Sequence, residues 1–154
     1  MAAQRPGLTQ ALGRMFNITT ARGCHFEEMC RWLDQERVED QSGFYFQKEA
    51  LAESLAAGEM FCGVLNGSAI AFATFSIKSS GYIDIMEVHP EHRRRGFGKE
   101  LALFVINHLF VSGMSSIYVT CAPRESEFFW RSIGFTTHTA YENEHPRLVL
   151  RNAP

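Results

Sequence analysis

Long hydrophobic runs are absent from the 154-residue sequence, and no apolar stretch approaches the ~18 residues that a membrane-spanning helix requires. Residues 1–12 also lack the apolar core of a secretory signal peptide. The four cysteines, Cys24, Cys30, Cys62 and Cys121, form no C-x-x-C pair and no metal-ligand spacing. We therefore expect a cytoplasmic protein with free thiols, no metal and no membrane association.

A broad basic surplus is missing as well. The chain carries 15 Lys and Arg against 17 Asp and Glu, which gives a net charge of −2. Binding to a nucleic-acid backbone needs an extended basic surface, so we expect no nucleic-acid partner. The length fits one domain with a substantial core, and we expect a single domain over residues 1–154 in which residues 1–14 form an N-terminal arm.

The one local concentration of basic residues is a run of three arginines at residues 93–95. They follow a predicted strand at 82–88 and precede a long apolar helix predicted from Lys99 to about Val111. Glycines at positions 96 and 98 separate the arginines from that helix. The chain is therefore organised around a strand, a basic glycine turn and a helix.

The physics of this turn indicates an anion. A helix start carries the positive end of the macrodipole, so three arginines there are unfavourable by roughly 0.3–1 kcal/mol each if nothing compensates. A bound phosphate would reverse the sign of that effect, and Gly96 and Gly98 would let main-chain amides approach it closely. The alternative interpretation is a solvated basic loop whose glycines serve only the turn.

Two common phosphate-binding motifs do not fit the turn. A dinucleotide-binding fingerprint requires a third glycine at the position of Leu101. A P-loop requires glycine at the position of Arg93 and Ser or Thr at the position of Glu100. Neither class of nucleotide-binding protein is therefore supported.

The remaining pattern predicts alternating short elements. Asn66-Gly67 between two apolar runs predicts a hairpin. The helix at 99–111 is apolar nearly all round, Leu103 and Phe104 included, which predicts a helix buried against a sheet. The strand that follows is expected to run parallel to the one before the helix. The other predicted strands and helices are strands at 16–21, 60–65, 69–77, 116–121, 135–141 and 147–150, and helices at 26–41, 48–57 and 126–133.

The pattern Arg93-x-x-Gly96-x-Gly98 resembles a signature of the GNAT acyltransferase superfamily. A second run, 129–135, resembles that family's aromatic-tyrosine-x-x-x-glycine-phenylalanine signature, and the order of predicted elements over 16–151 is also similar. The resemblance implies the α/β (α+β) GNAT fold, a mixed, mostly antiparallel sheet of six to seven strands with about four helices, in the order β-α-α-β-β-β-α-β-α-β-β.

The resemblance also implies an acetyl-CoA-dependent N-acetyltransferase, which moves an acetyl group to an amine of a small molecule or protein by direct attack in a ternary complex. Acetyl-CoA would be the co-substrate, with its pyrophosphate in the turn and its pantetheine arm along strand 82–88. The residues assigned to it are Met86, Val88, Arg93, Arg94, Arg95, Gly96, Phe97, Gly98, Lys99 and Phe129.

The departing thiolate is the first difficulty in this mechanism. Many family members have a proton-donating tyrosine where this chain has Trp130, and an indole N–H is no acid at neutral pH. Tyr118 and Cys121 on the next predicted strand are candidate substitutes, and each also reads as an ordinary core residue. A thiol with a pKa near ~8.5 also leaves fairly well unaided.

The general base is the second open assignment. Glu87 and Asp84 are the carboxylates of strand 82–88, and alternation places them on opposite faces, with Ile83 on the Glu87 face. A bulge, which the family carries near this point, would change that arrangement. We favour Glu87 because it adjoins Val88, although either carboxylate could serve a salt bridge or a solvated face.

Several further features leave alternatives open. Trp130 also fits a catalytically impaired CoA-binding regulatory or interaction module. Residues 44–46 are aromatic and form either a buried hinge or a wall of the acceptor pocket, and acidic residues in the loop at 142–146 either attract a cationic amine or are merely solvated. His89 and His92 lack an apparent third ligand, so we interpret them as loop histidines. A C-terminal edge strand could pair with a second copy in a homodimer.

Overall fold

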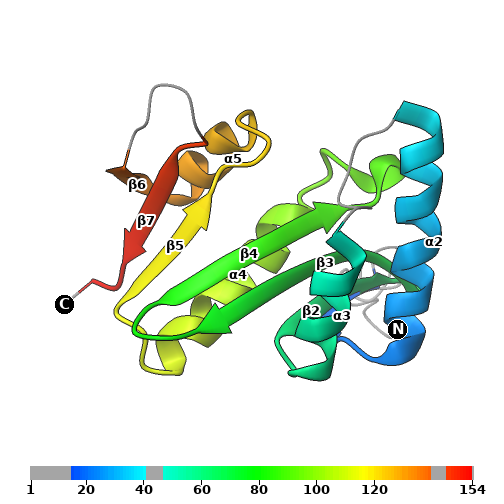
Figure 1. Ribbon diagram of the computed structural model, residues 1–154, viewed down its shortest axis with the longest axis horizontal. Helices are drawn as coiled ribbons and strands as arrows, with labels where there is room; N and C mark the ends of the chain where they lie inside the picture. The colour runs from blue at the N-terminus through cyan, green and yellow to red at the C-terminus, as the bar shows by residue number, and fades with distance from the viewer. Residues whose placement is uncertain (1–14, 41–46, 140–144, 154) are drawn as a thin grey trace, which may run out of the picture.

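The computed structural model describes residues 15–40, 47–139 and 145–153, and the expectations for residues 1–14, 44–46, 142 and 144 lie outside this part. The elements, drawn in Figure 1, are β1 (Phe16–Thr20), α2 (Gly23–Asp40), α3 (Lys48–Ala56), β2 (Met60–Leu65), β3 (Ser68–Ile77), β4 (Gly81–Val88), the 3-10 turn η2 (Pro90–His92), α4 (Phe97–Val111), β5 (Ser116–Thr120), α5 (Ser126–Ile133), β6 (Thr136–Thr139) and β7 (Arg147–Arg151).

The strands form one sheet in the order β1-β2-β3-β4-β5-β7-β6. β4 and β5 run parallel and the other neighbouring pairs run antiparallel. A parallel pair needs a crossover, and α4 supplies it. The predicted fold class and element order are confirmed. The C-terminal strand β7 lies inside the sheet because it returns along β5, so β6 is the edge strand at this end.

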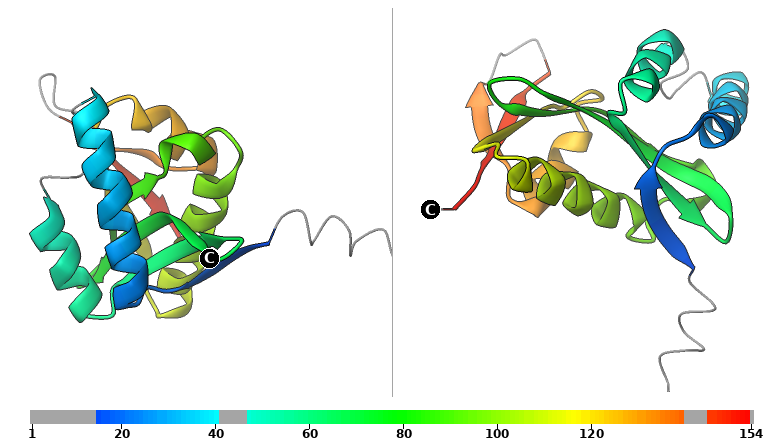
Figure 2. Two further views of the ribbon diagram at one scale, coloured as in Figure 1. Left: turned by 90° about the vertical axis from the view of Figure 1, so that its right-hand side faces the viewer. Right: turned by 90° about the horizontal axis from the view of Figure 1, so that it is seen from below.

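Helices cover both faces of the sheet, α2 and α3 on one face and α4 on the other (Figure 2). The β2–β3 hairpin turns at Asn66 and Gly67, whose φ angles of 49° and 86° are both left-handed, as a two-residue hairpin turn requires. On the α2 side, Met29 and Leu33 pack with Phe72 of β3 in a buried cluster. This central part of the sheet holds the start of α4 and the end of β4 in fixed positions.

The outer face of α4 differs from the sequence-based expectation. Leu101, Val105 and Leu109 are fully buried against the sheet, but Leu103 is 45% exposed and Phe104 is 41% exposed. The prediction that this helix is buried against the sheet is confirmed for its inner face, whereas the apolar side chains of its outer face are exposed. A helix that packs on a single sheet buries only the side chains that face that sheet.

A β-bulge in β4 sets which side chains face which helix. The register pairs Ile83 with Phe75 and Ile85 with Thr74, so Asp84 is the extra residue of the bulge. The Ile85 amide donates to the Thr74 hydroxyl at 3.1 Å. A bulge shifts the alternation by one residue.

The consequence appears in the packing on the two sides of β4. Ile83 packs with Met86 and Val88 in the cluster that contains α4, whereas Ile85 packs on the side of α2 and α3. Strict alternation had placed Ile83 with Ile85 and Glu87, and that placement was wrong; the alternative, a bulge of the kind that the family resemblance implied, is confirmed. Beyond the bulge, the predicted alternation of Met86, Glu87 and Val88 is confirmed.

Candidate active site

The candidate site is a cleft of about 950 Å³ that opens where β4 and β5 separate. Their pairing runs from Gly81–Ile117 to Ile83–Val119. Past this point the end of β4, the turn and the start of α4 line one side of the cleft, and residues of β5 and α5 line the other. The cleft is thus built at the carboxyl ends of the parallel pair, the place where open α/β sheets commonly bind ligands.

The main chain at the end of β4 faces this opening. The His89 amide donates to the carbonyl of Ile70 on β3 at 2.7 Å. Because neighbouring residues of a strand turn their N–H and C=O groups to opposite edges, Val88 and Met86 direct theirs away from β3 and toward the cleft. Their predicted pairing with a pantetheine arm fits this geometry and stays a prediction.

The turn presents further main-chain amides at the start of α4. Gly96 is the N-cap of this helix with φ of 87°, and Arg94 also has a left-handed φ of 63°. A glycine N-cap brings no side chain to cover the first amides of the helix. Such successive amides form a concave anion-binding nest. A Cβ on Gly98 would lie 3.3 Å from Val88 Cγ2, so a side chain there would crowd the cleft wall.

The basic and aromatic residues of the turn have separate surroundings. Arg94 and Lys99 are exposed and line the cleft. Arg95 lies 3.1 Å from His92 Nδ1 and over the Phe97 ring at 5.2 Å. Phe97 is only 2% exposed and packs in a buried cluster with Leu65 and Ile70, so its ring is part of the core.

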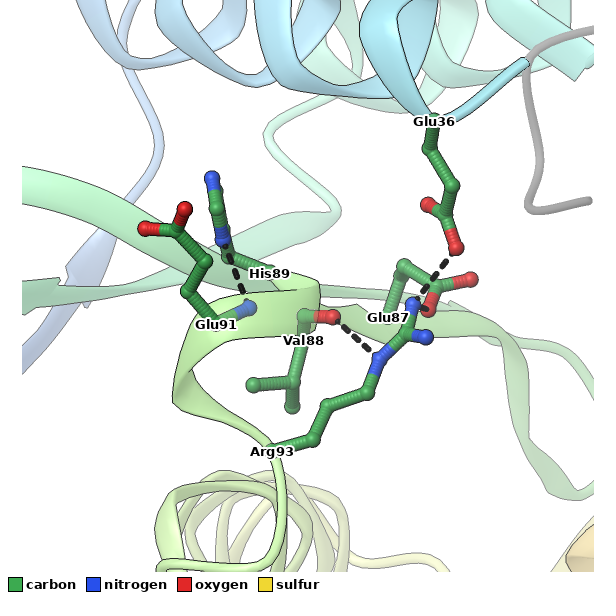
Figure 3. A network of polar contacts seen from close by, with 6 residues as sticks. All are labelled: Glu36, Glu87, Val88, His89, Glu91 and Arg93. Atoms are coloured by element: carbon green, nitrogen blue, oxygen red, sulfur yellow. Dashed lines mark hydrogen bonds and ion pairs between the residues drawn. The ribbon is translucent and has the colours of Figure 1, made fainter. Parts of the chain in front are cut away.

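Arg93 turns its guanidinium toward the end of β4 and toward α2 (Figure 3). Its Nε donates to the Val88 carbonyl at 2.9 Å, its Nη2 donates to Glu36 Oε1 at 2.7 Å, and it also pairs with Glu87. Burial alone would lower the pKa of Arg93, but the hydrogen bond to Glu36 and the charges of Glu87 and Glu36 raise it overall. Sequence reasoning missed Glu36, which lies 57 positions before Arg93.

The two candidate bases both line the cleft. The Glu87 side chain is 13% exposed and points toward Arg93. Burial raises the pKa of Asp84, against the opposing effects of a hydrogen bond from Ser76 and the charge of Lys78. The structure therefore brings both carboxylates to one cleft, while the role of each stays a prediction.

Trp130, in place of the usual tyrosine, is buried in the main core. Its ring meets Phe129 and Phe135 edge-on, with centroids 4.9 and 5.4 Å away. Phe129 and Trp130 also line the cleft, beside Gly98. The predicted contact of Phe129 with the cofactor stays a prediction that this placement allows.

The candidate acids on β5 are less favourably placed. Tyr118 stacks on Tyr82 at 5.7 Å and meets His138 at 4.9 Å, whereas its neighbours Val119 and Thr120 line the cleft. Cys121 is fully buried, and burial raises the pKa of its thiol. The catalytic role of Tyr118 stays a prediction.

The histidines beside the turn have local partners. His89 Nδ1 accepts from the Glu91 amide at 3.1 Å, and burial, followed by the neighbouring His89 and Arg95, lowers the pKa of His92. Over residues 15–40, 47–139 and 145–153, no three metal-ligating side chains gather into a group that could hold an ion. None of the helices in the described ranges combines the length and apolarity that a bilayer crossing demands.

Solved structures with the same fold include several acetyltransferases. The PaiA N-acetyltransferase from Thermoplasma acidophilum, in complex with coenzyme A, is 13% identical with a TM-score of 0.73, over 89% of this chain and 99% of that chain. A GNAT family acetyltransferase from Brucella melitensis, in complex with acetyl-CoA, is 15% identical with a TM-score of 0.70, over 90% of this chain and 89% of that chain. At such low identity these likenesses establish the fold alone.

A third similar structure is the ribosomal-protein-S18-alanine N-acetyltransferase from Escherichia coli, which is 17% identical with a TM-score of 0.66, over 88% of this chain and 91% of that chain. No curated protein matches the sequence. The sequence model of the Acetyltransferase (GNAT) family matches residues 26–135, which is more than half of the chain. The protein therefore belongs to the GNAT acetyltransferase family, and the resemblance seen in its two signatures is confirmed.

Proposed function

We propose that this protein is an acetyl-CoA-dependent N-acetyltransferase that acetylates an amine of a small molecule or protein. The observation that carries the proposal is the cleft itself, where the strand edge of Met86 and Val88 meets the amide nest at the start of α4. Family membership supports it, as do the similar structures that contain coenzyme A or acetyl-CoA. The Escherichia coli relative, named for an alanine of a ribosomal protein, supports an amine as acceptor.

The residues present fit a coenzyme A molecule. The amides of residues 93–99, with Arg94, Arg95 and Lys99, would hold the pyrophosphate. The edge of β4 at Met86 and Val88, which faces away from β3, would pair with the pantetheine arm, and Phe129 would contact the arm from α5. When bound, acetyl-CoA supplies an activated acetyl thioester. The chain's own contribution is to orient this group and polarise it by strand amides.

The acceptor amine must lose a proton before it attacks, since a lysine-like amine has a pKa near ~10.4. Glu87 is the proposed base, with Asp84 as the alternative, because both line the cleft. The buried indole of Trp130 supplies no proton. We propose that the thiolate departs unaided or with help from Tyr118, whose ring stacks on Tyr82 rather than on the cleft lining.

The direct test follows thiol release from acetyl-CoA in the presence of a panel of small amines and amine-terminated peptides. The proposal expects release that depends on at least one acceptor and yields its N-acetyl product by mass spectrometry. Tight binding of coenzyme A without turnover across the whole panel would contradict the enzyme assignment. That result would favour the second candidate, a catalytically impaired CoA-binding module, which the replacement of the usual tyrosine by Trp130 supports.

The cellular setting is a further proposal. Cys24, Cys30, Cys62 and Cys121 are all free thiols, which supports a reducing cytoplasmic location. The proposed homodimer would form through the edge strand β6, because β7 already pairs on both sides. Size-exclusion chromatography with light scattering tests the dimer.

A further inference from the structure

Arg93 belongs to the basic turn by sequence but not by the direction of its side chain. Its guanidinium contacts three groups, the Val88 carbonyl, the Glu36 carboxylate and the Glu87 carboxylate. In Figure 3, Glu36 descends from α2 while Glu87 and Val88 come from the end of β4. The side chain therefore ties helix α2 to the strand that lines the cleft.

The atoms used in these contacts matter. Nε and Nη2 form one edge of the planar guanidinium, the edge that recognises planar anions with two parallel hydrogen bonds. Here Nε is bound to the Val88 carbonyl, and Nη2 is shared by Glu36 and Glu87. A phosphate approaching this edge would also meet two carboxylates of its own sign. The Arg93 side chain is thus poorly placed to bind the pyrophosphate, unlike those of Arg94 and Lys99.

Glu36 makes this arrangement costly to assemble. Its side chain is 2% exposed, although an ionised carboxylate is stable in such a position only when it is paired and hydrogen-bonded. The hydrogen bond from Arg93 Nη2 at 2.7 Å supplies such pairing. Glu36 also lines the cleft together with Glu87. A buried charge held at the wall of a cleft, beside the proposed base, suggests a function beyond stability.

We propose that Glu36 and Arg93 are positioning residues that fix the carboxylate of Glu87 on the acceptor side of the cleft. The inference rests on the proposed function, because it concerns the geometry of the proposed base. Glu36 holds the guanidinium from α2, and the Val88 carbonyl fixes its position along β4. The guanidinium in turn holds the Glu87 carboxylate through their ion pair. A base must stay within hydrogen-bond reach of the amine, and misplacement by about 1 Å can cost roughly 100-fold in rate.

The test compares steady-state kinetics of two positioning variants with those of a phosphate-site variant. Glu36→Gln keeps the shape of the side chain and removes its charge. Arg93→Lys keeps the positive charge and removes the planar guanidinium that contacts several groups at once. Both should lower kcat by about 10- to 100-fold while the KM for acetyl-CoA stays within about twofold. Lys99→Gln should do the reverse, raising the KM for acetyl-CoA with little change in kcat.

A matched control separates this role from general destabilisation. Glu127→Gln breaks another ion pair, the one to Arg131 at 2.8 Å within α5, and should leave kcat within about twofold of wild type. In a double-mutant cycle, Glu36→Gln added to Glu87→Gln should lower kcat by less than about twofold further, because the positioned group is already gone. Circular dichroism and coenzyme A titration verify that each variant is folded.

Two results would overturn the inference while leaving the proposed function intact. One is an Arg93→Lys variant that raises the KM for acetyl-CoA as Lys99→Gln does, which would make Arg93 a phosphate ligand. The other is a full additive loss from Glu36→Gln in the Glu87→Gln background. A wild-type protein that releases no thiol with any amine contradicts the proposed function itself, and the inference falls with it. If Glu36→Gln does not fold, the Arg93→Lys kinetics decide alone.

Discussion

The two ends of the cleft are built in different ways. The proposed phosphate end is one continuous stretch, residues 94–99, whose amides and exposed cations come from a single turn and the first turn of α4. The proposed acceptor end would be assembled from Glu36 of α2 and from Asp84 and Glu87 of β4, which all line the cleft. The first end needs only local backbone conformation, whereas the second exists only after distant segments have packed together.

The difference separates binding from chemistry. Local glycines and left-handed φ angles at the turn would create the proposed anion site from backbone conformation alone. The acceptor end holds an ion-pair network in which one guanidinium joins two carboxylates. Changes at the first end should therefore appear in affinity for acetyl-CoA, and changes at the second end should appear in turnover.

The largest expected effect comes from the acceptor end. Glu87→Gln removes the proposed base without changing its shape, and kcat should fall by about 100- to 10,000-fold, the usual contribution of general base catalysis. The KM for acetyl-CoA should stay within about twofold. Stopped-time assays of thiol release measure both constants. A normal kcat in this variant would transfer the role to Asp84, and Asp84→Asn would then show the loss.

The next effect comes from the phosphate end. Gly98→Asp brings a like charge to the pyrophosphate and a side chain toward Val88, where even a Cβ lies 3.3 Å from Cγ2. Like charges in contact cost several kcal/mol, so the Kd for coenzyme A should rise by about 100-fold or more in calorimetry. Lys99→Glu, on an exposed side chain, repeats the charge change without crowding. Undiminished affinity in both variants would contradict the phosphate assignment.

A smaller effect is expected from Tyr118 on β5. Tyr118→Phe removes a hydroxyl from a ring that stacks on Tyr82 at 5.7 Å, and kcat should change by less than about threefold. The comparison is made at saturating acetyl-CoA. A loss of tenfold or more would instead assign Tyr118 as the acid that protonates the thiolate, and the acceptor end would extend to β5.

The smallest effect concerns stability at the bulge. Because the folded state raises the pKa of Asp84, it holds the Asp84 proton more tightly than the unfolded chain does. The stability from this group is present below the unfolded pKa near ~3.9 and is lost as pH rises through the folded pKa. Asp84→Asn should therefore lose less free energy of unfolding than wild type between about pH 3.5 and pH 7. Urea unfolding of both proteins across that pH range measures the difference. An equal change in the free energy of unfolding for wild type and variant would contradict this contribution of Asp84.

The sequence predicted what depends on neighbouring residues. Asn66-Gly67 specified its hairpin, and the Gly96 turn specified the start of the helix after it, because each depends on local backbone conformation. Two strands and a helix with the right spacing were enough to predict the parallel pair across α4. These features were predictable since one segment contains their cause.

The remaining features depend on partners far along the chain. The bulge at Asp84 leaves no trace in the apolar pattern, because one extra residue changes the faces without changing the composition. From the sequence, Arg93 resembles its basic neighbours in the turn, because its partner Glu36 lies 57 positions away on α2. The exposure of the outer face of α4 was not predicted, because an apolar sequence pattern does not show how many sides of a helix are covered by the rest of the protein.

The most direct measurement is a crystal structure of the protein with coenzyme A bound. The account predicts a diphosphate against the amides of residues 94–99, a pantetheine arm along Met86 and Val88, and a sulfur on the side of the cleft that holds Glu87. A ligand that lodges elsewhere, with the mouth of α4 left open to solvent, would contradict the account.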